Sequence, residues 1–226
     1  MNRAIHLTAI VGLLAFLLLI IGTSGTYASP FITDCTVITQ PGSYILTNNI
    51  MATQNNVKPI GPGAAAAACI LITVDSVTLD LGGFAITATN LNPNVEVEGI
   101  STNFNGSQLA DHYGIYVHSG TVANFSSAGV NLHGHGLTVE HIRAVKNQQG
   151  IVVNSVNGTP NGNRIADNTL IFNSLVGISV ACPSVVVGNV AAGNGTGTPG
   201  AQIVEGDAGI LGNGPCTNAE NSPDIP

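Results

Sequence analysis

The chain has 226 residues, of which only 8% are charged, with five Lys and Arg against twelve Asp and Glu. These few cations cannot pair with the successive phosphates of a nucleic acid or with an anionic membrane surface. Neither nucleic acid nor such a membrane is therefore an expected partner. Solvated helices need many Glu, Lys and Arg, whereas this chain is rich in Gly, Asn, Ser and Thr, which favours β-structure.

The N-terminus has the layout of an export signal. Arg3 precedes an unbroken apolar run from Ala9 to Gly22, and small residues then lead to Ala28. This order of charged, apolar and cleavable regions is typical of secretory signals, and the run is shorter than the roughly 20 residues that span a bilayer. We predict a signal peptide over residues 1–28, with its retention as an anchor left open. The protein would be secreted or extracytoplasmic, in the periplasm or at a cell surface.

Residues 29–226 would then form one domain with its own core. Removal of Arg3 leaves four cations against twelve acids, a formal charge of 4 − 12 = −8. No Gly-rich phosphate loop opens a helix and no G-x-S-x-G occurs, so nucleotide binding and α/β-hydrolase chemistry have no support. We expect no membrane insertion of the mature chain.

Two early segments are similar to each other, CTVITQPGSYIL over 35–46 and CILITVDSVTLD over 69–80. The second runs into Gly82-Gly83, after which an apolar alternation restarts at Phe84 and Ile86. Such a pattern predicts short strands joined by a sharp bend. We expect one set of side chains to point inward before the bend: Val77, Leu79 and Leu81. Phe84 and Ile86 would line the next face.

A Gly-Ile start recurs later, at unequal intervals, at Gly114, Gly150, Gly177 and Gly209. Similar second halves follow at 137–147, 164–173 and 185–194. Two other segments are interpreted as loops. The segment 55–68 carries an alanine run that would form at most a helical turn, and 89–112 carries one short strand at Val95–Ile100.

One such unit cannot bury its apolar side, but units stacked as coils of a parallel β-solenoid bury a continuous core. At this point the sequence resembles the right-handed parallel β-helix proteins of the pectin lyase-like superfamily, over most of Cys35 to Cys216. The resemblance implies an all-β, right-handed parallel β-helix of about five to seven coils over 29–226, with 213–226 as a cap and tail. It implies little about activity, because that superfamily is functionally mixed.

Cysteine spacing tests the stack. The interval from Cys35 to Cys69 is the step of the early repeat, and the interval from Cys182 to Cys216 is equal to it. If that step is one coil, equivalent positions lie about 4.8 Å apart, within the Cα separations of roughly 4.4–6.8 Å that a disulfide needs. We predict the disulfides Cys35–Cys69 and Cys182–Cys216, one near each end. Four buried free thiols are the alternative.

Histidines provide the first candidate chemistry, with His133 and His135 at i and i+2. A carboxylate such as Glu140 or Asp111 would complete a metal set, although turn histidines without a ligand explain the pattern as well. Gly134-His135-Gly136 also resembles an element of polygalacturonase-type glycosidases, in which the histidine assists catalytic aspartates. The acidic elements of that family are absent here, which leaves His135 without acids to assist.

Paired carboxylates at i, i+2 provide the second, as Glu96 with Glu98 and Glu205 with Asp207. Each pair would project to one side of a strand and hold calcium, the one cofactor that we consider, or divide acid and base roles. The alternative is that Val95 and Val97 pack inward while Glu96 and Glu98 face water. Glu205 and Asp207 are the metal candidates.

A row of outward-facing side chains provides the third candidate site, if the segment at 77–81 aligns with 137–141. Asp80 would then stack beside Glu140, with Arg143 as a basic neighbour. Such a row would bind a carbohydrate, or would simply be the solvated side of a sheet. The asparagines that end the half-units are interpreted as structural, in stacked amide columns: Asn147, Asn173 and Asn194, with Asn168 and Asn189.

We find no complete catalytic constellation, so the sequence favours a non-catalytic surface or carbohydrate-binding protein whose partner is a polysaccharide or cell-surface glycan. The rival interpretation is a polysaccharide lyase or glycoside hydrolase whose catalytic residues gather on one exposed face: Asp80, His135, Glu140 and Arg143. A structural or adhesive spacer is the third.

Overall fold

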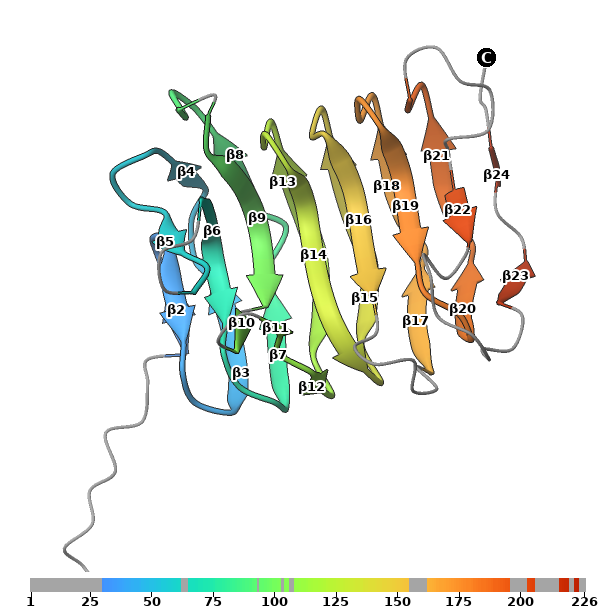
Figure 1. Ribbon diagram of the computed structural model, residues 1–226, viewed down its shortest axis with the longest axis horizontal. Helices are drawn as coiled ribbons and strands as arrows, with labels where there is room; N and C mark the ends of the chain where they lie inside the picture. The colour runs from blue at the N-terminus through green and yellow to red at the C-terminus, as the bar shows by residue number, and fades with distance from the viewer. Residues whose placement is uncertain are drawn as a thin grey trace, which may run out of the picture.

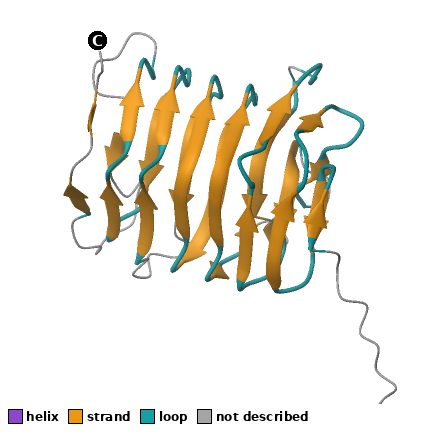
Figure 2. Ribbon diagram, turned by 180° about the vertical axis from the view of Figure 1, so that it is seen from behind, coloured by secondary structure: helices purple, strands orange, loops and turns teal. Residues whose placement is uncertain are grey.

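The computed structural model describes residues 30–61, 65–92, 94–102, 104–105, 108–154, 162–195, 203–205, 216–219 and 222–223. Within these ranges every regular element is a strand, and Figure 2 shows no helix there. The strands stack side by side in chain order to form a flat, elongated body (Figure 1). Residues 1–28, the predicted signal peptide, lie outside the described residues.

The strands form two large sheets, which we call sheet A and sheet B. Sheet B follows the order β2 (Thr36–Ile38), β6 (Ala66–Ile72), β9 (Glu96–Thr102), β14 (Ala128–His135), β16 (Gln149–Asn154), β19 (Val176–Val180) and β22 (Ile203–Glu205). Two short strands extend it: β5 (Lys58–Pro59), antiparallel to β6, and β12 (His112–Tyr113), parallel to β14. A separate antiparallel hairpin joins β10 (Phe104–Asn105) and β11 (Gln108–Leu109).

Sheet A follows the order β1 (Phe31–Ile32), β3 (Gly42–Leu46), β7 (Val77–Asp80), β13 (Tyr116–Ala123), β15 (Thr138–Val145), β17 (Asn163–Ala166), β20 (Ser184–Val187) and β23 (Thr217–Ala219). A second, bent half is made by β4 (Ile50–Ala52), β8 (Ala85–Ala88), β18 (Thr169–Ile171), β21 (Val190–Ala192) and β24 (Ser222–Pro223). The long strands β13 and β15 cross both halves. All pairings along these two paths are parallel, and the chain alternates between the sheets.

Inward side chains form columns that run through successive strands. In sheet A one column contains Leu79, Val117, Val139, Ile165 and Val186, all in register and fully buried. Full burial of each such side chain contributes about 2 kcal/mol. In sheet B a matching column faces it: Ile70, Ile100, Val130, Ile151 and Ile178. The core is therefore continuous from rung to rung.

The double glycine is the bend that the sequence predicts. Gly82 and Gly83 have φ of 58° and 80°, which a residue with a side chain rarely adopts. The three side chains before the bend are fully buried: Val77, Leu79 and Leu81. After the bend Ile86 is buried and Phe84 packs against the same core, so the strand restarts as a continuation of one wall.

The Gly-Ile repeats do not all begin equivalent strands, and the first of them is the exception. Gly150 and Gly177 introduce or enter strands of sheet B, but Gly114 leads into β13 in sheet A, where Val117 pairs with Val139. The residue of sheet B that corresponds to Ile151 is Val130. A Gly-Ile dipeptide marks the start of an apolar alternation, and nothing in it specifies which of two walls that alternation joins.

Two segments interpreted as loops contain core strands. β6 begins at Ala66 inside the alanine run, and alanine forms no helical turn there because both edges of the strand are paired. β9 extends the predicted short strand to Thr102 and lies in the middle of sheet B. The step between equivalent residues is therefore uneven: Thr78 pairs with the distant Tyr116, whereas Thr138 pairs with the nearer Arg164.

Buried asparagines form ladders at two bends, as the sequence predicts. At the end of sheet A, the Oδ1 atom of Asn173 accepts a hydrogen bond from the backbone N–H of Asn147 at 3.0 Å. The Oδ1 atom of Asn194 likewise accepts from the backbone N–H of Asn173 at 2.9 Å. The side-chain amide of Asn173 donates to the Ala144 carbonyl at 3.1 Å. A second ladder joins Asn168 and Asn189. Each amide thus satisfies backbone groups that a turn leaves unpaired.

Both predicted disulfides are present near opposite ends of the stack. The Cα atoms are 4.4 Å apart in Cys35–Cys69 and 5.0 Å apart in Cys182–Cys216. Two disulfides indicate an oxidising, extracytoplasmic environment. Among the described residues we find no helix with the length and apolar character that a membrane span requires.

Candidate functional site

Three of the four predicted catalytic residues lie on sheet A. Asp80 and Glu140 do share one row, but they are not neighbours, because His118 of β13 pairs with both and separates them. The expected adjacency of the two acids is wrong for the reason given above: the strand after Gly114 inserts one more rung. The row therefore alternates acid, imidazole and acid, so the two carboxylates are not adjacent.

Each acid of this row has a partner. His118 Nδ1 lies 3.5 Å from Asp80 Oδ1, and Arg164 Nη1 lies 2.7 Å from Glu140 Oε2. Tyr116 donates its hydroxyl to Glu140 Oε1, which raises the pKa of Tyr116 to about 12. The ring of Tyr116 stacks on that of His118, with centroids 4.4 Å apart. These five side chains, Asp80, Tyr116, His118, Glu140 and Arg164, are named the sheet A polar row.

The basic neighbour of Glu140 is Arg164 rather than the predicted Arg143. His141, with φ of 54°, bends β15 between Glu140 and Arg143, and Arg143 pairs in register with Thr121 and Thr169 beyond the bend. Arg143 is exposed. A carboxylate that accepts from a phenol and a guanidinium is a fixed acceptor and is poorly placed to take a proton from a substrate.

His135 ends β14 of sheet B, on a different sheet from the other three predicted catalytic residues. Its Nε2 atom lies 2.8 Å from Asp111 Oδ2, and its ring is 5.3 Å from that of Tyr113. The structure therefore does not gather the predicted quartet around one groove. It does pair His135 with Asp111, one of the two carboxylates that the sequence offered for this histidine.

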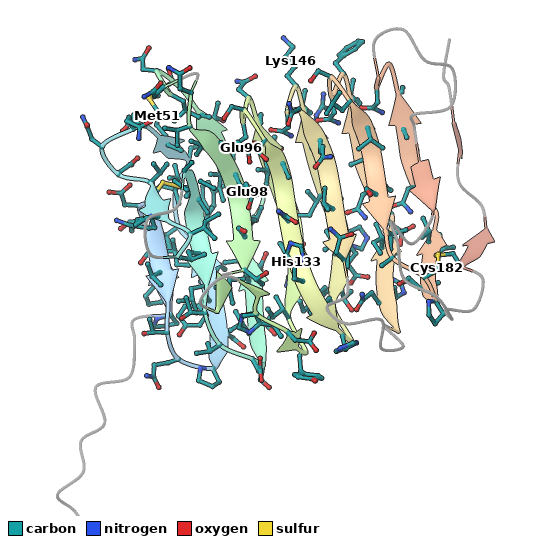
Figure 3. All side chains as sticks on the ribbon, in the orientation of Figure 1. Met51, Glu96, Glu98, His133, Lys146 and Cys182 are labelled. Atoms are coloured by element: carbon teal, nitrogen blue, oxygen red, sulfur yellow. A yellow bond between two sulfur atoms is a disulfide. The ribbon has the colours of Figure 1, made fainter. Side chains whose placement is uncertain are left out.

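A second polar group lies buried on the outer face of sheet B. Glu98 pairs in register with Ala68, which packs with Ile60 and Leu71 outside the main core, so Glu98 points away from that core. Its side chain is nevertheless only 7% exposed, while Glu96 is exposed to solvent (Figure 3). The expectation that both glutamates behave alike is therefore wrong.

The buried group has unusual protonation. Burial raises the pKa of Glu98 to about 7, although the Asn131 amide donates to its Oε1 atom at 2.6 Å. Burial, with His112 nearby, lowers the pKa of His133 to about 4. Four buried atoms in this region have no hydrogen-bond partner: Glu98 Oε2, Asn131 Oδ1, His133 Nδ1 and Asp111 Oδ1. We name Glu98, Asn131 and His133 the sheet B buried cluster; nothing in the sequence pattern marks it as buried.

The metal candidates are not brought into a described site. Glu205 ends β22, in register with Val180, and Asp207 lies outside the described residues. In the described ranges, no three His, Cys, Asp or Glu side chains are grouped to hold a metal ion. A cavity of about 280 Å³ lies at the N-terminal end, lined by residues 31–39 and Tyr44, which belong to neither polar region.

Comparisons of the chain with protein-family models, with curated proteins and with solved structures found no match. The two polar regions differ in their exposure to solvent and in their hydrogen bonding. The sheet A polar row is partly exposed and its acids are paired, whereas each residue of the sheet B buried cluster has one buried atom without a hydrogen-bond partner. Only the first offers groups that a large ligand reaches without a change of structure.

Proposed function

We propose that this chain is a secreted right-handed parallel β-helix protein of the pectin lyase-like type that binds a polysaccharide without cleaving it. Seven strands in the path of sheet B and the alternation of the chain between two parallel sheets support the helical winding. Crossovers between parallel strands are right-handed in almost all proteins, which supports the handedness. The signal peptide over 1–28 belongs to the same proposal.

The observation that carries the proposal is the sheet A polar row. It sets acceptors and donors on four successive strands, β7, β13, β15 and β17, at the regular spacing of a sheet. Tyr116, stacked on His118, adds an aromatic surface, and flanking threonines add hydroxyls (Thr78 and Thr138). A repeating polymer of hydroxylated rings matches such a repeating surface. The pairing of Asp80 with His118 and of Glu140 with Arg164 favours recognition over acid–base catalysis.

A lyase or hydrolase is the second candidate, because the pKa of Glu98 near 7 is in the range that general acids use. Its Oε2 atom is buried, so a substrate would reach it only after the covering residues move. We therefore rank it below binding. A structural spacer would use neither polar region.

The test is a glycan array with the mature chain, followed by calorimetric titration of an oligosaccharide that binds. Glu140→Gln removes one carboxylate charge from the sheet A polar row, and Glu96→Gln is the matched control on sheet B. We expect Glu140→Gln to weaken binding on the order of tenfold, the value of a hydrogen bond to a charged group, and Glu96→Gln to have no effect.

Absence of glycan binding, or equal affinities in the two variants, would contradict the proposal. A parallel assay measures absorbance of unsaturated products with and without calcium, together with release of reducing ends. Turnover that Glu98→Gln abolishes would replace binding with catalysis.

A further inference from the structure

A bulky aromatic residue occupies a left-handed backbone position at the turn that leaves sheet A. The strand ends Ala123, Val145, Ile171 and Ala192 are in register, so the four residues that follow them are equivalent. All four have positive φ: Asn124 (65°), Lys146 (55°), Phe172 (57°) and Gly193 (62°). Gly and Asn accept this conformation readily, whereas a bulky residue there is a genuine outlier.

Phe172 is also 62% exposed. Backbone strain and an exposed phenyl ring each oppose stability, and burial of this ring in the fold does not offset them. Residues held in strained backbone conformations are concentrated at sites of function.

The ring has a prepared position on the next rung. A Cβ atom built on Gly193 would lie 2.7 Å from both Cδ1 and Cε1 of Phe172, closer than real contacts allow. The glycine therefore leaves room for the phenyl ring against its own backbone. Part of the ring is covered by this contact, and the remainder is open to solvent.

The turn beneath the ring is held firmly. Asn173, the next residue, is buried in the asparagine ladder. The N–H groups of Ser174 and Leu175 donate to the carbonyls of Asn147 and Gln148 at 2.9 Å and 2.7 Å. A ring on so constrained a backbone loses little freedom when it meets a ligand, because few torsions remain to be fixed.

The turn of Phe172 and the turn on the preceding rung also carry one exposed apolar residue and several polar ones. Leu175 is 51% exposed, and the side chains of Gln148 and Ser174 are exposed in the same turns. Lys146 stands on the preceding rung and points away from the sheets (Figure 3). An open aromatic face beside amide, hydroxyl and ammonium groups fits a ligand with an apolar face and a hydroxylated rim.

We infer that Phe172 is the platform on which one sugar ring of a glycan stacks, with hydroxyls meeting Gln148, Ser174 and Lys146. The ligand class, a glycan, rests on the proposed function. The position of the platform does not depend on it, because Phe172 lies at the turn and outside the sheet A polar row. An anionic membrane would repel the mature chain, whose four cations and twelve acids give a formal charge of −8 once residues 1–28 are removed. A second copy would need a larger apolar area than one ring and one leucine provide.

The experiment titrates the mature protein with cellohexaose, mannohexaose and hexagalacturonate by calorimetry and by saturation-transfer difference NMR. Phe172→Asn removes the ring while keeping a residue that accepts positive φ, as Asn124 does at the equivalent turn. Phe172→Tyr keeps the ring, and Phe31→Ala removes another phenyl ring that is 60% exposed, at the end of the stack.

We expect Phe172→Asn to lose affinity by tenfold or more with an unchanged or higher melting temperature, and Phe172→Tyr and Phe31→Ala to bind as the wild type does. A Phe172→Asn variant that binds a sugar as tightly as the wild type overturns this inference and leaves the proposed function standing. A wild type that binds no sugar in either measurement overturns both. A concentration-dependent mass that Phe172→Asn abolishes would assign the ring to self-contact and also overturn the inference.

Discussion

The asparagine ladder and the sheet B buried cluster both place polar atoms out of reach of water, yet they differ in how those atoms are hydrogen-bonded. In the ladder each amide bonds to the next rung and to a carbonyl, so Asn173 has its donors and acceptors occupied. In the cluster Glu98, Asn131 and His133 each keep one atom without a partner. Burial alone therefore does not decide whether a polar group stabilises this stack.

The difference follows from repetition. Ladder residues recur at equivalent positions on consecutive rungs, so an amide always meets another amide. Asn131 instead pairs in register with Ser101 and Val152, and Glu98 pairs with Ala68. A parallel stack satisfies a buried amide fully when the equivalent residue on the next rung is also an amide, which is the case in the ladder and not in the cluster.

Removal of a ladder residue should produce the largest loss. Asn173→Ala strands the Asn147 N–H and the Ala144 carbonyl, which we expect to lower the free energy of unfolding by about 3 kcal/mol or more. Urea unfolding measures the effect, and Gln148→Ala in the same turn is the control, with a change of about 0.5 kcal/mol or less. Equal free energies of unfolding for Asn173→Ala and the wild type would show that the ladder does not stabilise the fold.

Removal of the charge of Glu98 should act in the opposite direction. The pKa of Glu98 is about 7 in the fold and ordinarily 4.5, so between these values the folded protein keeps a proton that the unfolded chain releases. The contribution of Glu98 to the free energy of unfolding is therefore fully present below pH 4.5 and is lost as the pH rises to 7. Glu98→Gln cannot ionise, so at pH 8 we expect a gain of up to about 3 kcal/mol. Glu96→Gln should leave stability unchanged. A Glu98→Gln protein less stable than the wild type at pH 8 would refute the assignment.

His133 should show the mirror-image profile. Its pKa falls from 6.5 to about 4 in the fold, so the unfolded chain binds a proton first and stability is lost as the pH falls through that window. Between about pH 4.5 and 6.5 the slopes from Glu98 and His133 cancel. Each single variant, Glu98→Gln or His133→Asn, should reveal the slope of the other residue, about 1.4 kcal/mol per pH unit.

Denaturation midpoints measured across pH 4 to 7 (the window set by the two shifts) test this pair. His141→Asn, at an exposed position with positive φ, is the control and should follow the wild type. Parallel curves for all four proteins would show that neither buried group titrates as described.

The sheet A polar row should respond least in stability. Arg164 is 44% exposed, so we expect Glu140→Gln to change the free energy of unfolding by less than about 1 kcal/mol. The same change removes the main cause of the raised pKa of Tyr116, which should fall from about 12 toward 10. Ultraviolet titration of the phenolate detects that fall, and Glu96→Gln should not produce it.

Much of the fold follows from the spacing of residues. The equal intervals within the two cysteine pairs predict both disulfides, because one coil sets the distance between equivalent positions, and the alternation around Gly82-Gly83 predicts which side chains are buried. The phase of β13 does not follow, since an apolar alternation is compatible with either sheet. That single ambiguity placed His118 between Asp80 and Glu140, whereas the change of basic neighbour from Arg143 to Arg164 follows from the bend at His141.

The sites are less predictable than the fold, for a physical reason. Whether Glu98 is buried depends on what covers the outer face of sheet B, and a strand's own sequence does not encode its cover. Phe172 belongs to the same class: its φ becomes visible only when its turn is aligned with those of Asn124 and Gly193.

The two disulfides also determine how the molecule responds to a pulling force. Each bond closes a loop of one coil near one end, so a load applied to the termini is carried through sulfur and bypasses those loops. Extension is then restricted to the rungs between Cys69 and Cys182, which hold three of the ladder residues, Asn147, Asn168 and Asn173. Under reducing conditions the terminal rungs would peel away first, so the redox state of the surroundings sets where mechanical failure begins.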